Sequence, residues 1–414
     1  MQLLPGFRDF PPEECAKRNY ILTRWREVAR RYGFVEYDGP MLESVELYQK
    51  KSGGELVGQL FDFTDKGGRH VALRPEMTPS LARIVVARHR DYRKPMKWFC
   101  VPPFFRYEKQ QRGRLREFSQ LNCDILGEAS PAADAELIAM LIDLLRAFGF
   151  GEEDFVVRLS DRDAWIRFAT SRGVPEERVP DLLAIVDKLE RARPEETSQK
   201  LSELGLTLEE VRAFIAQPGS EASKLHGVRD DLKARGLEKY VDLDLTIVRG
   251  LAYYTGLVFE VFDRAKSERA LAGGGRYDQL ISLMSDGKIA LPALGFGMGD
   301  VVLGNFIDDR PAASALRDQW IAAHRAIDAF VIIAKEERRP DALALIQKLR
   351  ESGRRVEFEL TPAKVGKQFQ TAEQLGARRA VLIGDEWPQV KIKTLASREE
   401  QLVSSSELFA LLGG

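Results

Sequence analysis

Cysteine is scarce in this chain of 414 residues, and the three that occur, Cys15, Cys100 and Cys123, form no closely spaced pair. This scarcity argues against a disulfide framework and against CxxC redox or zinc motifs. The four histidines lack an H-x-x-x-H spacing, so we expect no zinc site and no metal held by the protein itself. A reducing cytoplasm is the expected location.

Net charge is also nearly absent. Lys and Arg total 62 and Asp and Glu total 63, for a formal net charge of −1. A chain with this balance has no overall attraction for nucleic acid, so any such binding must use a local patch. The chain does not open on a basic region followed by an apolar run, and no apolar stretch approaches the roughly 18 residues of a membrane span. We therefore expect neither a signal peptide nor a membrane anchor.

Three common catalytic signatures are missing as well. The sequence has no Walker A motif, no G-x-G-x-x-G opening a βαβ unit and no G-x-S-x-G. ATP binding therefore cannot be inferred from a phosphate-binding loop motif. What the chain does have is a composition of 44% hydrophobic and 30% charged residues, which is typical of a globular protein, and a length that predicts two or three domains.

The hydrophobic pattern divides the chain into four parts. Residues 1–160 mix helix-period and strand-like runs, whereas residues 161–240 are charged, of helical period and without a clear strand, which predicts a helical insertion. Strand patterns return in residues 241–322, and residues 323–414 form the last part. The helices expected before the insertion are 14–32, 75–89 and 132–148, and the strands are 34–37, 60–63, 71–73, 96–102 and 118–126. After it we expect strands at 243–249 and 257–262 and a linker at 308–327.

The last part predicts a small, separate α/β domain. Its expected order is strand 329–334, helix 340–352, strand 354–360, helix 365–376, strands 379–383 and 389–395, and helix 405–412. Residues 325–414 carry 15 basic and 13 acidic side chains, so non-specific attraction to RNA should be modest. Candidates for contacts to unstacked bases are Lys364, Lys367, Gln368 and Arg378; an ordinary solvated face is the alternative.

A local basic patch does exist, between residues 93 and 116. Eight basic residues and one acidic residue, Glu108, give it a net charge of +7, and Trp98, Phe104, Phe105 and Tyr107 lie among them. The pattern predicts a hairpin that holds Arg106 on a strand and leaves loop arginines free to reach phosphate. A solvated basic hairpin is the alternative.

Four further motifs are weaker when taken alone. Leu73–Thr78 places a carboxylate and a hydroxyl two residues apart at a helix start. The two groups could bind one ammonium group of a ligand, or the carboxylate could simply complement the helix dipole. Val248–Gly256 is a strand end facing a pocket or a turn with packed tyrosines. Ala272–Asp278 contains three glycines, which allow close approach of a ligand or form a flexible turn. Gly295–Gly299 has small residues at alternate positions, which either clear space for a flat ligand or allow tight packing.

Taken in order, these motifs resemble those of the histidyl-tRNA synthetases, a class II family, along nearly the whole chain. Residues 4–9 resemble the family's N-terminal P-x-G-x-x-D element, residues 33–48 around Pro40 motif 1, and residues 106–127 motif 2. Leu73–Glu76 and Arg249–Tyr254 resemble the signatures that separate the histidine enzymes from other class II members. Residues 366–369 resemble part of the anticodon-binding module.

The resemblance implies an α+β fold: a mixed, mostly antiparallel sheet flanked by helices, with the helical insertion and a C-terminal α/β anticodon-binding domain. It implies a histidine–tRNA ligase that uses ATP with Mg²⁺ and acts on L-histidine and its tRNA in the cytoplasm. Motif 1 implies a homodimer.

The resemblance also implies a role for each matching position. Glu76, Thr78 and Gln120 would hold the histidine ammonium group, and Asp124 and Tyr254 the imidazole, with Tyr253 beside them. Arg106 would bind the α-phosphate, Arg249 would bridge the histidine carboxylate to it, and Phe118 would stack on adenine near Glu108. Arg114 and Arg116 would serve the ATP phosphates or the tRNA acceptor end.

Two positions depart from the family pattern. Ala252 stands where Asp is usual, and Gly299-Asp300-Val301-Val302 stands where the family has motif 3, Gly-x-Glu-Arg, whose arginine grips the γ-phosphate. A branch resembling the plant organellar enzymes looks similar at both positions, and Arg276 is a candidate replacement for the missing arginine. The alternative is a non-catalytic regulatory subunit of ATP phosphoribosyltransferase, which resembles the synthetase core and commonly lacks the C-terminal domain.

Overall fold

The computed structural model describes residues 2–49, 54–109, 111–189, 192–217, 222–248, 253–265 and 269–412. The chain forms two compact units, residues 1–317 and residues 318–414, which are described separately. No helix among the described residues is long and apolar enough to cross a bilayer.

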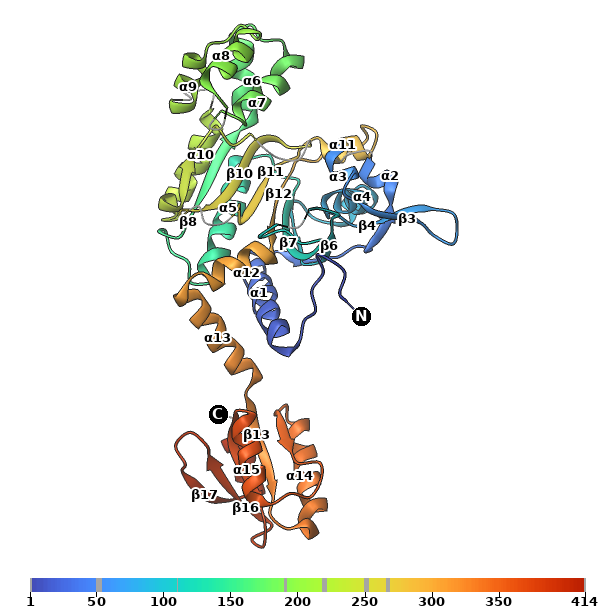
Figure 1. Cartoon of the computed structure of the whole chain (residues 1–414), viewed down its shortest axis with the longest axis vertical. Helices are drawn as coiled ribbons and strands as arrows, with labels where there is room; N and C mark the ends of the chain where they lie inside the picture. The colour runs from blue at the N-terminus through green and yellow to red at the C-terminus, as the bar shows by residue number, and fades with distance from the viewer. Residues whose placement is uncertain are drawn as a thin grey trace. The chain divides into compact units, whose positions relative to one another are not determined.

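The first unit is built on a nine-stranded mixed sheet (Figure 1). The order is β1-β5-β7-β12-β11-β10-β8-β9, with β6 paired to β7; β1–β5 and β8–β9 are parallel and the other pairs antiparallel. The strands are β1 (Val35–Glu36), β5 (Met96–Cys100), β6 (Pro103–Phe105), β7 (Glu117–Leu126), β8 (Phe155–Asp161), β9 (Val241–Leu243), β10 (Thr255–Asp263), β11 (Ala272–Arg276) and β12 (Ala293–Gly299).

Three helices, α1 (Pro12–Arg31), α5 (Pro131–Arg146) and α12 (Asp300–Asp308), pack against β7. Helix α1 begins at a proline, where the missing N–H costs nothing, and its acidic first turn and basic last turn complement the helix dipole. It buries an apolar stripe that includes Trp25 and Val28. Because successive strand residues point to opposite faces, the helices cover one face of β7 and leave the other for a site.

A smaller sheet of β2 (Leu42–Ser44), β4 (His70–Leu73) and β3 (Phe61–Thr64) stands beside the main one. Helices α2 (Val45–Gln49) and α3 (Gly54–Val57) lie near it. Helix α4 (Thr78–Arg88) starts just after β4, lies against α11 (Leu280–Met284), and ends in the short 3₁₀ turn His89–Asp91. The path from β4 into α4 carries the Leu73–Thr78 motif, which therefore sits at a strand-to-helix turn.

The segment after β8 is helical, and its first four helices gather into one lobe in Figure 1. These are α6 (Arg162–Ser171), α7 (Val179–Val186), α8 (Pro194–Ser202) and α9 (Leu208–Ala216). The last helix of the segment, α10 (Ser223–Ala234), packs instead on α5 and β8. Short 3₁₀ turns lie at Glu176–Arg178 and Glu238–Tyr240.

Two expectations from the sequence are wrong here, and one of two open readings is excluded. The expected strand 243–249 ends at Leu243, because the Asp244 carboxylate accepts from the Thr246 amide (3.0 Å) and hydroxyl and so holds a turn. The three-glycine run is no flexible turn but strand β11, paired on both sides. The expected linker 308–327 is mostly helix α13 (Pro311–Arg325), because proline at the first position and an alanine-rich sequence both favour a helix.

The second unit has a five-stranded sheet in the order β14-β13-β15-β16-β17, parallel in its first three strands and antiparallel after them. Val331 and Ile333 of β13 face α14 and α16, whereas Phe330 and Ile332 face α15, so helices cover both faces. The elements are β13 (Ile327–Ile333), a 3₁₀ turn (Glu336–Arg338), α14 (Arg339–Glu351), β14 (Val356–Phe358), α15 (Val365–Gln374), β15 (Ala377–Ile383), β16 (Gln389–Thr394), β17 (Glu400–Ser404) and α16 (Ser405–Leu411).

The sequence pattern missed β17 and misread one side chain of this unit. Strand β17 is mostly polar and lies at the sheet edge. Its sequence therefore shows little of the alternation between apolar and polar residues that predicts a strand. Gln368 is buried: its amide accepts from the Ile333 N–H and donates to the Ile333 carbonyl, both at 2.9 Å. It anchors α15 to β13 and is not available to RNA, whereas Lys364, Lys367 and Arg378 are exposed.

Candidate active site

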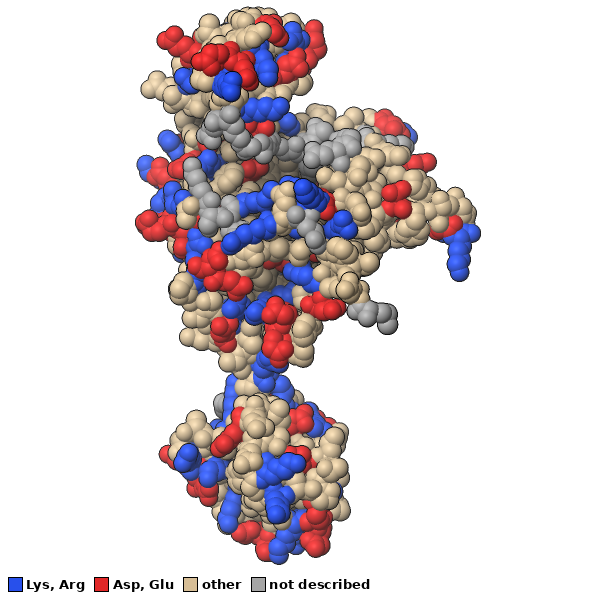
Figure 2. Space-filling model, in the orientation of Figure 1, with Lys and Arg blue, Asp and Glu red and all other residues tan. Residues whose placement is uncertain are grey.

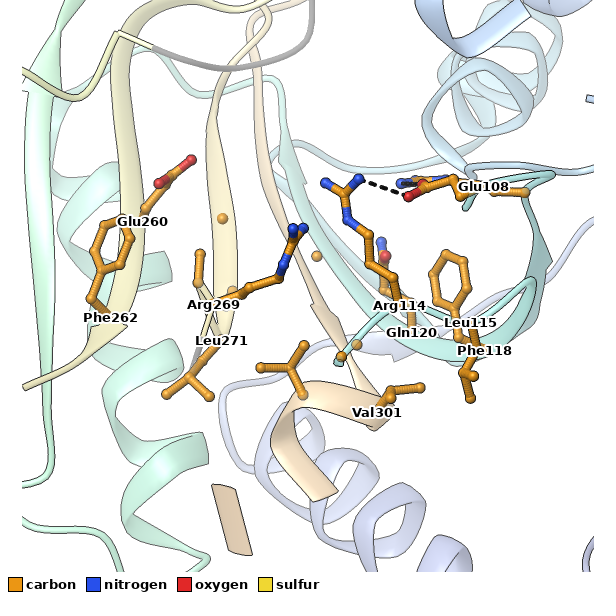
Figure 3. Close-up of a pocket in the computed structure, with 18 residues that line it drawn as sticks. Glu108, Arg114, Leu115, Phe118, Gln120, Glu260, Phe262, Arg269, Leu271 and Val301 are labelled. Carbon is orange, nitrogen blue, oxygen red and sulfur yellow. Dashed lines mark ion pairs between the residues drawn. The ribbon is translucent and has the colours of Figure 1, made fainter. Parts of the chain in front are cut away.

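A cavity of about 710 Å³ opens on the face of the sheet where β7, β12, β11 and β10 lie side by side (Figure 3). Its walls come from the hairpin of β6 and β7, from β10 and β11, and from the first turn of α12. Five residues to which the resemblance assigns a substrate-binding role line it: Arg106, Glu108, Arg114, Phe118 and Gln120. Figure 2 shows Lys and Arg side chains gathered on the visible face of the first unit over these strands.

Strand β7 is the backbone of this site. Phe118, Gln120, Asn122 and Asp124 occupy alternate positions and therefore share one face of the strand. At about 3.3 Å per residue, this row spans about 20 Å, the length of an extended nucleotide and amino acid placed end to end. Phe118 and Gln120 line the open cavity, while Asp124 is only 4% exposed at the inner end.

Arg106 follows β6 and is held by two contacts. Its Nε donates to the Pro75 carbonyl at 2.8 Å, and its guanidinium lies 5.3 Å from the ring centre of Phe118. The first contact ties the arginine to the strand-to-helix turn that carries Glu76, and the second to the β7 row. The guanidinium is thus oriented before any ligand arrives.

The loop between the two hairpin strands supplies a second arginine. Arg114 Nη1 lies 2.8 Å from Glu108 Oε2, and Glu108 also lies 4.0 Å from Arg106. Arg114 stays about half exposed, so a phosphate can compete for it. Arg116 differs: its guanidinium stacks 4.0 Å from the Tyr107 ring centre, its aliphatic part packs on Gly6, and it does not line the cavity. The structure therefore separates Arg116 from the ATP-binding set in which the sequence placed it.

At the inner end, β12 makes room for the side chains of β7. A Cβ built on Gly295 would lie 2.0 Å from Asp124 Oδ1, and one built on Gly297 would lie 2.3 Å from Gln120 Nε2. The alternating glycines thus clear the space that the Asp124 carboxylate and the Gln120 amide occupy.

Gly295→Ala is expected to raise the KM for histidine in ATP–pyrophosphate exchange by about 10- to 100-fold. Overpacking of this kind costs about 1–3 kcal/mol, and here the added Cβ displaces the Asp124 carboxylate and also lies 2.9 Å from the Cys123 carbonyl oxygen. Steady-state kinetics with varied histidine measure the effect. Gly304→Ala is the matched control, since its nearest neighbour would be 3.9 Å away. An unchanged KM for Gly295→Ala would show that the Asp124 position does not bear on histidine binding.

Asp124 has a partner that the sequence analysis missed. The Tyr277 hydroxyl donates to Asp124 Oδ1 at 2.5 Å, and both residues are buried. Burial raises the pKa of Asp124 to about 7, and the Tyr277 hydrogen bond opposes that rise. Because burial destabilises the charged carboxylate, a ligand N–H that donates to Asp124 would stabilise it. Only the proximity of Arg276-Tyr277-Asp278 to the three glycines hinted at this tyrosine.

Glu76 and the two tyrosines close the inner end. The Tyr253 hydroxyl donates to Glu76 Oε2 at 2.8 Å, and Glu76 is 3% exposed. The side chain of Thr78 is hydrogen-bonded to Tyr253. The Tyr254 ring lies edge-on to Tyr253 at 5.4 Å; burial raises the pKa of Tyr254, and the nearby charges of Glu76 and Asp124 raise it further. The structure thus brings Glu76, Thr78, Tyr253, Tyr254 and Asp124 together.

Arg276 is not brought to the cavity. Its Nε lies 2.8 Å and its Nη2 3.0 Å from the two carboxylate oxygens of Asp134 in α5, and it also donates to the Ser130 carbonyl. It is 6% exposed. This buried ion pair fastens β11 to α5, so the structure does not support Arg276 as an ATP ligand. Arg249 and Ala252 lie outside the described residues.

The departure at motif 3 has a structural counterpart. Asp300 is buried, pairs with Arg8 at 2.7 Å and accepts from the Ser119 amide at 2.9 Å. It ties α12 to β7 and to the N-terminal segment. Val301 and Val302 follow and line the cavity, so this wall is apolar. Arg269 and Glu260, from the β10–β11 side, also line the cavity and had not been singled out from the sequence, since neither belongs to a recognisable motif.

Residues 6–299 match the family model described as histidyl-tRNA synthetase, and residues 328–413 match the anticodon binding domain. The chain is 41% identical to the histidine–tRNA ligase of Opitutus terrae, over 99% of this chain and 98% of that protein. It is 34% identical to the chloroplastic/mitochondrial histidine–tRNA ligase of Arabidopsis thaliana, over 97% of this chain and 85% of that protein.

Among solved structures, histidyl-tRNA synthetase from Nostoc sp. matches with a TM-score of 0.77, covering 100% of this chain and 98% of that chain at 23% identity. This likeness confirms the class II synthetase fold expected from the motifs. The family models together span both compact units, and the relatives match over nearly the full length. The chain therefore belongs to the histidyl-tRNA synthetase family.

Proposed function

We propose that this protein is a histidine–tRNA ligase, which activates histidine with ATP and transfers it to the 3′ end of the histidine tRNA. The observation that carries the proposal is the row of alternate residues on β7, which joins an open basic cavity to a buried carboxyl pocket. The full-length similarity to histidine–tRNA ligases, C-terminal unit included, favours this reading over a regulatory subunit.

In the first step, the histidine carboxylate attacks the α-phosphorus of ATP and pyrophosphate leaves. The nucleophile is already ionised at neutral pH, so the protein needs no general base. Its task is to hold the two reactants in line and to stabilise charge that grows on the α-phosphate. Arg106, oriented by Pro75 and Phe118, is the described cation best placed for that task.

The amino acid occupies the inner end. Glu76 and Thr78 at the inner end, and Gln120 farther along the β7 row, bind the ammonium group through a carboxylate, a hydroxyl and an amide. Asp124 accepts from the imidazole, with Tyr277 holding the carboxyl from one side and Tyr254 facing the ring beside Tyr253. Specificity for histidine follows from burial, since a side chain without a ring N–H leaves the buried Asp124 carboxyl with the Tyr277 hydrogen bond but without one from the substrate.

ATP occupies the outer cavity, with adenine on Phe118 near Glu108 and the phosphates toward Arg106 and Arg114. Mg²⁺ accompanies the nucleotide and neutralises phosphate charge when bound. We expect the ion to be held mainly by the phosphates and water. The terminal ribose hydroxyl of the tRNA then attacks the adenylate.

We also propose a homodimer formed through the motif 1 region. Val35, Met41 and Leu42 are 63%, 45% and 40% exposed, an unusual concentration of large apolar side chains on one short segment. The expected location is the cytoplasm, in keeping with three unpaired cysteines, two of them buried.

The decisive experiment is histidine-dependent ATP–pyrophosphate exchange in the absence of tRNA. Purified protein with ATP, Mg²⁺ and histidine should exchange, and omission of histidine should abolish the signal. A protein that binds histidine but performs no exchange would fit the non-catalytic regulatory subunit instead.

Removing the second unit is expected to separate the two steps. A chain ending at Arg325, the last residue of α13, keeps the whole first unit and should retain exchange. It should charge tRNA poorly, chiefly through a higher KM for tRNA, because the anticodon-binding module has been removed. Dimerisation must be measured on the same sample. Full tRNA charging by a dimeric truncated chain would rule out anticodon recognition by the second unit.

A further inference from the structure

The cavity lacks a cation at the place where the family has one. Val302, at the position of the motif 3 arginine, lies with Val301 in the first turn of α12 and forms an apolar part of the wall. Asp300, just before them, is fully engaged by Arg8 and the Ser119 amide. An ATP molecule in this cavity therefore loses a contact to its outer phosphates unless another residue supplies it.

Arg269 enters the same cavity from the opposite direction. It lies just before β11, is exposed, and lines the cavity together with Glu260, Phe262 and Leu271. Figure 3 shows its side chain extending from the β11 side toward Arg114, which extends from the hairpin loop. Arg269 Nη2 donates to Gln111 Oε1 at 2.6 Å, so its guanidinium reaches across to that loop.

The other arginines near the cavity are committed elsewhere. Arg276 is buried against Asp134, and Arg116 is stacked on Tyr107. Of the described residues that line the cavity, the cations are Arg106, Arg114 and Arg269. Arg106 is fixed near Pro75 and Phe118, and Arg114 is held by Glu108. Among the described residues, Arg269 is hydrogen-bonded to a neutral amide, and an exposed guanidinium exchanges such a partner for phosphate at little cost.

We propose that Arg269 binds the β- or γ-phosphate of ATP and takes the place of the motif 3 arginine that this chain lacks. The inference rests on the proposed function only in that the cavity receives ATP. As the bond between the α-phosphorus and the bridging oxygen breaks, negative charge moves onto the departing pyrophosphate, and a guanidinium there stabilises it. Arg269 and Arg106 thus act on opposite ends of the same triphosphate.

The test is direct binding of ATP and of AMP to Arg269→Ala and to Arg269→Gln in the full-length chain. Hydrogen bonds to charged groups contribute about 1.5–3 kcal/mol, so ATP binding should weaken by about 10- to 100-fold. AMP binding should not change, because AMP lacks the outer phosphates, and histidine binding should not change either. Adding Val302→Arg to Arg269→Ala should restore part of the ATP affinity, since Val302 faces the same cavity.

Two controls separate a phosphate contact from a structural one. Arg264 is an exposed arginine in the same β10–β11 connection; it donates to the Glu152 carbonyl and does not line the cavity. The Arg264→Ala variant should therefore bind ATP normally. Gln111→Ala removes the loop partner and keeps the charge, so it should also bind ATP normally. If Gln111→Ala reproduces the loss, or if Arg269→Ala weakens ATP and AMP equally, the proposal is wrong.

The binding measurement also keeps the two proposals apart. If the wild-type chain shows no exchange activity, the ligase proposal is contradicted. The ratio of ATP affinity to AMP affinity, compared between the wild type and Arg269→Ala, would still test the role of Arg269. Normal exchange and ATP binding in Arg269→Ala would overturn the role of Arg269 and leave the ligase assignment intact.

Discussion

Replacing Arg106 by alanine is expected to slow histidine-dependent ATP–pyrophosphate exchange by about 10²–10³-fold. This is the usual loss when one fixed donor to developing charge is removed. Arg106 is suited to that role because Pro75 and Phe118 orient its guanidinium before substrate binds. The loss should appear mainly in kcat, with the Kd for histidine nearly unchanged, since the proposed amino-acid site lies at the inner end of the β7 row.

Arg112→Ala is the matched control for this variant. Arg112 lies in the same hairpin loop and pairs with Asp309 at 2.7 Å, but it does not line the cavity. An exposed pair of this kind contributes little to stability, so exchange should remain close to the wild-type rate. Equal losses in both variants would mean that hairpin charge in general matters, and not the placement of Arg106.

Asp124→Ala is expected to lower the preference for histidine over apolar amino acids by about 10²–10⁴-fold in kcat/KM, together with activity. A buried site that hydrogen-bonds its substrate rejects analogues lacking the bond by about 10⁴–10⁵-fold, because its own polar groups would be left unpaired. Asp124 is 4% exposed and, within the described part of the chain, accepts a hydrogen bond from Tyr277; in the proposed site the ring N–H of histidine donates a second one. Without the carboxyl, binding an apolar amino acid no longer leaves a buried polar group unpaired, so apolar amino acids are rejected less strongly.

The measurement is exchange with histidine, phenylalanine and leucine, each at varied concentration, for the wild type and the variant. Asp242→Ala, an exposed acid on β9 of the same sheet, serves as the control and should change neither rate nor preference. Tyr277→Phe should give a smaller loss of preference, because it frees but does not remove the carboxyl. Undiminished selectivity in Asp124→Ala would make Asp124 a structural residue.

Much of the architecture follows from short-range patterns. Helix α1 and the alternation of strands and helices in the second unit were predicted within a few residues, because buried faces impose a period on the sequence. Elements whose sequence has no such period were missed or misread. Strand β17 is polar, β11 consists largely of glycine, and α13 follows from helix propensity with few buried positions.

In the site, too, the residues that follow a local sequence pattern could be predicted and the others could not. Spacing by two along one strand is visible in any sequence, so Phe118, Gln120 and Asp124 were readable as neighbours once β7 was predicted. The pairing of Tyr277 with Asp124 joins residues 153 positions apart, and no local pattern reports it. Gln368 looked like a polar surface residue by composition, yet its amide is used to fasten α15 to β13.

The family, the class of fold and the order of the motifs could be predicted from the residues alone, because these depend on residue identity and local periodicity. Which arginines are placed to meet a phosphate became clear only from the folded chain. Arg116, Arg276 and Arg269 carry the same charge and all lie near glycines or aromatics in the sequence. Arg116 stacks on Tyr107, Arg276 is buried against Asp134, and Arg269 extends into the cavity. A guanidinium acts on a ligand only where its donors are not already taken, and that depends on which distant elements the fold brings beside it.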